Sequence, residues 1–138
     1  MSDTLLQNMR THLLRDADLL ALISDRLYPD AAPHASTPFP YIVYFEVSFS
    51  TDHSLAGPTG LREVRIQFDV YSKAKKEAHD IRERILAVWD GYRGDPVFNG
   101  VKILCVEVAN QRTGYEHDER VYSYSLDLNF HYLVRASA

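Results

Sequence analysis

The stretch LREVRIQFDVYS, residues 61 to 72, alternates between apolar and polar side chains. The apolar row is Val64, Ile66, Phe68 and Val70, and the polar row is Glu63, Arg65, Gln67 and Asp69. Because successive side chains of a strand point to opposite faces of a sheet, this pattern predicts a strand with one face in the core. What the polar face meets, whether water, a substrate or another protein chain, is the question that the pattern raises.

Three other segments have the same two-residue period, and we predict strands at 41–49, 101–112 and 119–134. The segment 119–134 has the cleanest alternation. Its apolar row is Tyr122, Tyr124, Leu126, Leu128, Phe130 and Tyr132, and its polar row is Ser123, Ser125, Asp127, Asn129 and His131. In 41–49, one row is Tyr41, Val43, Phe45, Val47 and Phe49, and the other is Ile42, Tyr44, Glu46 and Ser48.

Helical spacing of apolar residues predicts helices at 3–14, 17–24 and 73–90. We expect Asp16 to cap the second helix and Ser72 to cap the third. The second helix should turn Leu19, Leu20 and Ile23 inward. The third should bury a stripe made of Ala74, Ala78, Ile81, Ile85, Val88 and Trp89 and should end near Gly91.

Two segments without periodicity are predicted to be loops. Residues 29–40 contain four prolines, and residues 51–60, TDHSLAGPTG, form a long turn between the first two strands. We expect 30–39 and 51–60 to be the most mobile parts of the subunit. Loops of this length in a small domain are usually functional or disordered, so 51–60 is a candidate contact region.

The predicted order is helix, helix, strand, strand, helix, strand, strand, which indicates a single α+β domain. One-sided alternation is typical of antiparallel sheets, so we expect a four-stranded, mainly antiparallel sheet covered on one face by the 73–90 helix. The two hairpins should meet through strands 61–72 and 119–134 or through strands 41–49 and 101–112. We favour the first pairing, because these two strands alternate most completely. Their apolar rows should be buried against Ile81, Ile85 and Val88.

Composition changes this picture little. The chain has 138 residues, a net charge of −4 and a pI of about 5.8, which argues against a protein that binds nucleic acid through a basic face. The only cationic cluster, Lys73, Lys75 and Lys76, is best explained as a solvated helix face. Cys105 is the only cysteine, so we expect no internal disulfide, and its apolar surroundings in the sequence predict a small buried side chain. We find no signal peptide and no membrane span, and expect a reducing cytoplasm before assembly.

The polar sheet face carries the one candidate constellation for chemistry. Asp69, Glu107, Asp127 and His131 should share it, with Glu46 nearby, and such a set could hold a metal ion or act in acid–base catalysis. A solvated or protein-covered sheet face also collects such residues, and we favour that interpretation. No phosphate-binding loop or nucleophile motif is present, so we predict no catalytic residue, no cofactor and no metal.

Four segments together resemble a known family. They are ADLLALISDRLYP (17–29), PFPYIVYFEVSFSTDHSLAG (38–57), VRIQFDVYSKAKKEA (64–78) and YSYSLDLNFHY (122–132). In this order and spacing they resemble the tail completion proteins of long-tailed phages and prophages, which are related in fold to tail terminators. The resemblance covers nearly the whole chain and implies one tail-completion domain over residues 1–138.

What the resemblance implies is a structural virion protein, not an enzyme. Such proteins form a ring, commonly of six subunits, that caps the tail tube and docks to the head–tail connector or stopper protein, with DNA only as passing cargo. The expected location is the head-proximal end of the tail. For contacts between subunits or with the tube, the candidate residues are Asp52, His53, Ser54, Leu55, Arg65, Gln67 and Asp69.

Two alternatives remain open at this stage. One is another head-closure or minor tail component with the same kind of fold. The other is a small metal-dependent enzyme that uses Asp69, Glu107, Asp127 and His131.

Overall fold

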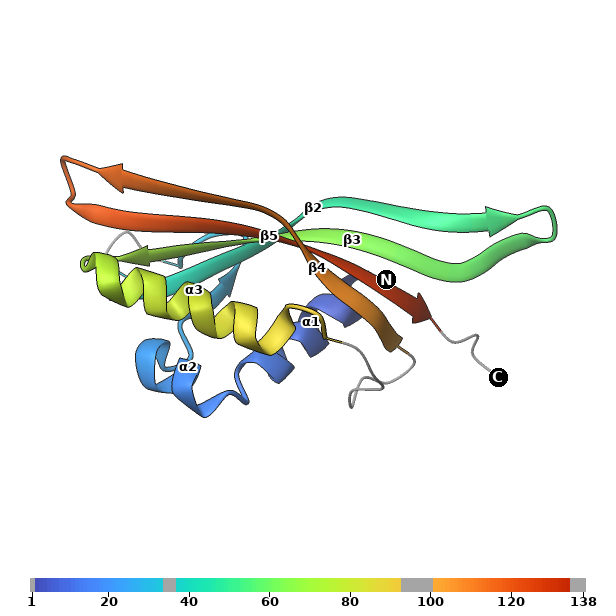
Figure 1. Ribbon diagram of the computed structural model, residues 1–138, viewed down its shortest axis with the longest axis horizontal. Helices are drawn as coiled ribbons and strands as arrows, with labels where there is room; N and C mark the ends of the chain where they lie inside the picture. Colours follow the sequence, from blue (N-terminus) through green and yellow to red (C-terminus); the bar gives the residue numbers. More distant parts are fainter. Residues whose placement is uncertain (1, 34–36, 93–100, 135–138) are drawn as a thin grey trace.

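The computed structural model describes residues 2–33, 37–92 and 101–134 and contains a five-stranded sheet with all three helices on one face (Figure 1). The elements are α1 (Ser2–Leu13), α2 (Ala17–Ile23), β1 (Leu27–Pro29), β2 (Tyr41–Ser54), β3 (Gly57–Ser72), α3 (Lys75–Trp89), β4 (Val101–Glu116) and β5 (Val121–Val134). None of the described helices is long and apolar enough to span a membrane. The mixed α and β composition that the sequence predicts is confirmed.

The strand order across the sheet is β1-β2-β3-β5-β4. The predicted pairing of strand 61–72 with strand 119–134 is confirmed, since β3 and β5 pair antiparallel from Leu61↔Leu133 to Ser72↔Tyr122. β2 pairs antiparallel with β3, and β4 with β5, as two long hairpins. These hairpins turn at opposite ends of the molecule (Figure 1).

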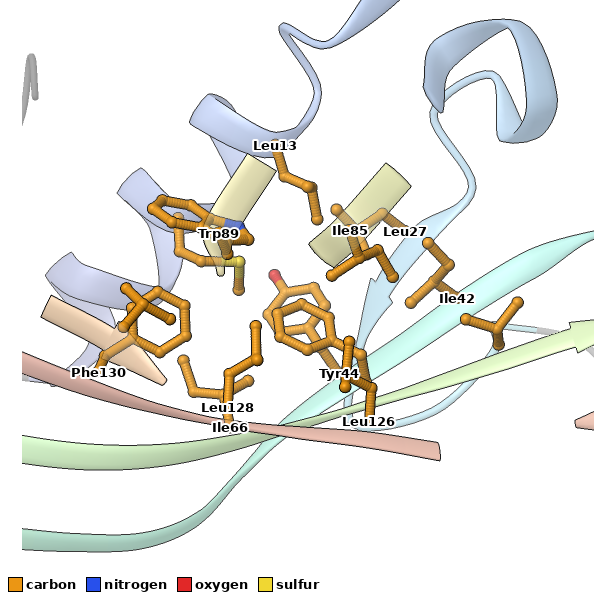
Figure 2. Packing of buried hydrophobic residues seen from close by; sticks show 14 of the residues in the cluster. Leu13, Leu27, Ile42, Tyr44, Ile66, Ile85, Trp89, Leu126, Leu128 and Phe130 are labelled. Carbon is orange, nitrogen blue, oxygen red and sulfur yellow. The ribbon is translucent and has the colours of Figure 1, made fainter. Parts of the chain in front are cut away.

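The predicted core is confirmed in its central part. The apolar row of β3 is 0% exposed. In β5, Leu126, Leu128 and Phe130 are also 0% exposed, and Tyr124 is 6% exposed. These rows pack against Ile81 and Ile85 of α3, while Val88 is only partly buried. Trp89 closes the end of the core, with its ring 5.1 Å from that of Phe130 (Figure 2).

The prediction of four strands is wrong, because Leu27–Pro29 forms a fifth strand. β1 pairs in parallel with β2 through Leu27↔Ile42, and Leu27 is fully buried. The Ile42 amide donates to the Arg26 carbonyl at 2.9 Å, and Arg26 Nε donates to the Pro40 carbonyl at 2.7 Å. Three residues are too few to show a two-residue period, so the sequence carries no visible signal for this strand.

The third helix is shorter than predicted, and its predicted cap is wrong. Ser72 ends β3 and is fully buried; its Oγ accepts from the Ala74 amide at 3.1 Å and donates to Glu77 Oε1 at 2.7 Å. Ala74 occupies the N-cap position instead. Gly91 follows the helix with a φ of +73° and donates its amide to the Val106 carbonyl at 3.0 Å, which ties the helix end to β4.

The predicted cap of the second helix is confirmed. Asp16 Oδ2 accepts from the Leu19 amide at 3.0 Å, and both carboxylate oxygens accept from the Arg84 guanidinium at 2.6 and 3.0 Å. The hydrogen bonds from Arg84 lower the pKa of Asp16 below its ordinary value. Leu19 and Ile23 are buried as predicted, but Leu20 is 38% exposed. The cap therefore also joins α2 to α3.

The segment 51–60 is not a loop, so that prediction is wrong. β2 and β3 continue through it to Ser54↔Gly57, which leaves only Leu55 and Ala56 as the turn. We call the part of this hairpin formed by residues 45–62 the arm. In the other predicted loop, the described residues 30–33 and 37–40 form no helix or strand; residues 34–36 lie outside the described residues.

Candidate functional site

The polar row of β3 lies beside the polar row of β5 on the sheet face opposite the helices, which we call the open face. The register brings Glu63 to His131, Arg65 to Asn129 and Gln67 to Asp127. The side chains of this row on β3 are half-buried, although no helix covers them. They lie among the polar side chains of β5, so this face is a polar layer of the sheet.

Asp127 is the centre of the open face. It is only 3% exposed, and its Oδ2 accepts from Arg65 Nε at 3.0 Å and from Arg65 Nη2 at 2.7 Å. Arg112 Nη2 lies 3.9 Å from Oδ1, which accepts no hydrogen bond from the described part of the chain. A buried carboxylate is costly without a cation, so Arg65 is the main partner that keeps this charge in the sheet.

Replacing Arg65 with alanine should lower the free energy of unfolding by about 1–3 kcal/mol, because Asp127 then stays buried without its donor. Urea denaturation measures this change. Gln67→Ala is the matched control, since Gln67 is a half-buried neighbour on the same row whose side-chain amide donates to Asp69 Oδ1 at 2.8 Å. The double variant Arg65→Ala/Asp127→Asn should recover part of the loss. Equal effects of Arg65→Ala and Gln67→Ala would contradict this account.

The proposed metal ligands occupy the open face in separate pairs. His131 Nε2 lies 2.8 Å from Glu107 Oε1, Asp69 bonds Gln67, and Asp127 bonds Arg65. Within the described residues, no group of three or more His, Cys, Asp or Glu side chains could hold a metal ion. The geometry therefore gives the metal-dependent enzyme hypothesis no ligand set.

Glu46 and Cys105 lie differently from what the sequence suggested. Glu46 pairs with Ile66 and so points to the helix-covered side of the sheet, away from the other candidate residues. Cys105 pairs with His131 on the open face and is half-buried, not a core residue. An irregular step in β4 between Ile103 and Cys105 breaks the strict alternation there. In β2 the irregular step comes after Glu46, which still belongs to the row of the buried Ile42 and Tyr44.

The arm carries the other group of candidate residues. Asp52, His53, Ser54 and Leu55 are all exposed, and Leu55 at the turn is fully exposed. Thr59 Oγ1 donates to the Asp52 carboxylate at 2.9 Å, and the Ser54 hydroxyl donates to the Gly57 carbonyl at 3.2 Å. These bonds hold the end of the arm in a defined shape although it extends beyond the helices (Figure 1).

The candidate contact residues thus fall on two surfaces. Arg65, Gln67 and Asp69 are engaged within the open face, whereas residues 52–55 are free to meet another molecule. Between the two surfaces, Asp52, Leu61, Glu63 and His131 help to line a shallow hollow of about 390 Å³. The sequence did not reveal that Val47, Phe49 and Leu61 are 47%, 41% and 40% exposed, because it did not reveal the arm.

Comparison with known proteins agrees with this architecture. A family model described as tail completion protein gp17 matches residues 7–133. A chain in the structure of the virion of a native gene transfer agent particle superposes with a TM-score of 0.72 at 16% sequence identity; the match covers 90% of this chain and 91% of that one. At this identity the likeness shows a shared fold. No curated protein matches the sequence.

Proposed function

Because the chain belongs to the tail completion protein gp17 family, we propose that it completes a phage tail tube by forming a ring at the head-proximal end of the tail. The family match over residues 7–133 carries this proposal. The family match supports a structural tail protein. We further propose the ring, its position and its docking to the head–tail connector or stopper protein.

The geometry supports an assembly role more than a catalytic one. The polar groups of the open face are used in pairs within the subunit, and the exposed apolar side chains lie mainly on the two hairpins. Subunits that contact head to tail close into a ring when the rotation between them divides a full turn. DNA would pass through such a ring as cargo.

We assign the end of the arm, residues 52–55, to the contact with the tail tube protein. These side chains are exposed and stand apart from the helices and from the open-face network. Arg65, Gln67 and Asp69 then stabilise the sheet that carries the arm. They do not themselves contact the tail tube protein.

Assembly measurements test the proposal. The subunit alone should be monomeric at micromolar concentration and should form larger closed species at high concentration or with tail tubes, because several docking sites on one tube end raise the effective concentration. Light scattering and electron microscopy of tubes check this, and rings should be seen at one tube end. A two-fold dimer at every concentration that does not bind tubes would refute both the ring and the function.

A further inference from the structure

Among the described residues, two strand edges of the sheet have long stretches without a partner, one on β2 and one on β4. β1 covers β2 only at Ile42–Tyr44, so the outer edge of β2 is unpaired along the arm. On β4, the Gly91 amide occupies the Val106 carbonyl, and no described residue pairs with the outer edge from Ala109 onward. An unpaired edge offers a row of amide and carbonyl groups to another strand.

Exposed apolar side chains mark both edges. Val47 and Phe49 are on the edge of β2, and Tyr115, 41% exposed, is on the edge of β4. Phe49 pairs with Val64, and Tyr115 pairs with Tyr122, so both project to the helix-covered side of the sheet. The two edges therefore carry matching surfaces on the same side.

The strand directions also match. β2, β3, β5 and β4 alternate in direction. Rotation about a ring axis leaves the direction of a strand along that axis unchanged. The β4 edge of one subunit and the β2 edge of the next would therefore run antiparallel, as every long pair within the subunit does.

The offset between the two edges agrees with a closed sheet. Ser50 shares a row with Glu63, and Arg112 shares a row with Asp69, so pairing Ser50 with Arg112 of a neighbour would displace the two edges by six residues of β3. At about 3.3 Å per residue this is roughly 20 Å, over a width of about 19 Å for four strands spaced about 4.8 Å apart. The ratio corresponds to a strand tilt of about 45°, near the 35–45° of closed barrels.

We propose that the β2 edge at 46–51 pairs with the β4 edge at 111–116 of a neighbouring copy, with Ser50 opposite Arg112. This inference rests on the proposed ring and specifies its subunit junction. Because the two edges are displaced by an even number of residues, Ser50 and Arg112 both lie on the open face. On the helix-covered side, Phe49 then lies opposite Thr113 and diagonal to Tyr115. Bulges flank the regular run Ser48–Thr51, so the edge is short, which fits a subunit that assembles only when concentrated.

Disulfide trapping tests this junction. In a Cys105→Ser background, Ser50→Cys combined with Arg112→Cys should give a ladder of covalent oligomers under mild oxidation, in conditions where closed species form. Within one subunit these positions are separated by β3 and β5, roughly 14 Å across the sheet. That exceeds the distance a disulfide can span, so any cross-link joins two subunits.

The controls separate the junction from the ring itself. Thr51→Cys with Arg112→Cys places the thiols on opposite faces and should give no ladder. Closed species without a ladder from the Ser50/Arg112 pair would overturn the junction and leave the ring standing. A ladder from Ser50→Cys with the native Cys105 would overturn the displacement, because those two residues share one row. Absence of closed species from the unaltered chain at every concentration and with tubes would overturn both.

Discussion

Phe68→Ala should lower the free energy of unfolding by about 3–5 kcal/mol, the largest single loss that we expect in this chain. Phe68 is 0% exposed at the middle of β3, between Tyr44 on β2 and Leu126 on β5. Its removal leaves a cavity below α3 that the surrounding strands cannot close. Urea denaturation followed by circular dichroism measures the change, and the slope with urea should stay the same.

Phe49→Ala is the matched control, because it makes the same chemical change at a side chain that is 41% exposed. We expect it to cost less than about 1 kcal/mol, since little apolar surface leaves the core. The same variant should weaken assembly if Phe49 lies at the junction between subunits. Equal losses of stability in the two variants would mean that the register of β3 is wrong.

Shortening the arm should abolish tail completion and leave the subunit folded. Replacing residues 52–61 with Asn-Gly joins Thr51 to its partner Arg62 through a two-residue turn of the kind that favours hairpins. Most of the removed side chains are exposed, so we expect stability to change by less than about 1 kcal/mol. Complementation of a virus that lacks the protein, with electron microscopy of the particles, measures the effect.

The opposite hairpin provides the control for that experiment. Replacing 117–120 with Asn-Gly between Glu116 and Val121 shortens the β4–β5 turn, which we do not assign to the tube. This variant should still complete tails. The shortened arm keeps residues 46–51, so it should still form closed species at high concentration. Normal infectious particles from the shortened arm would refute its role.

The sequence predicted the elements whose alternation is unbroken. In β3 and β5 every second residue is apolar, so the buried row and the pairing of the two strands followed directly. β2 was harder, because the irregular steps after Glu46 and Thr51 shift its side chains between faces. The Gly, Pro and Ser content of 51–60 is typical of loops, yet here the pairing of two strands outweighs composition.

The candidate site shows the same division. The pattern placed Asp127 and His131 on one face, since both belong to one strand. It could not show that Asp127 pairs with Arg65 while His131 pairs with Glu107, because those pairs depend on strand order and register. Glu46 was placed on the wrong face because its charge suggested the polar side, whereas regular alternation from the buried Ile42 and Tyr44 puts it on the helix-covered side.

The central pairing of β3 with β5 has a consequence for synthesis on the ribosome. Arg65 and Asp127, which meet across it, are 62 residues apart in the chain, whereas each hairpin closes locally. At about 5–20 residues per second, the first hairpin waits roughly 3–12 s for its partner strand. During that time β3 exposes the edge that later pairs with β5. We expect its charged row, Glu63, Arg65 and Asp69, to disfavour pairing of this edge with another nascent chain.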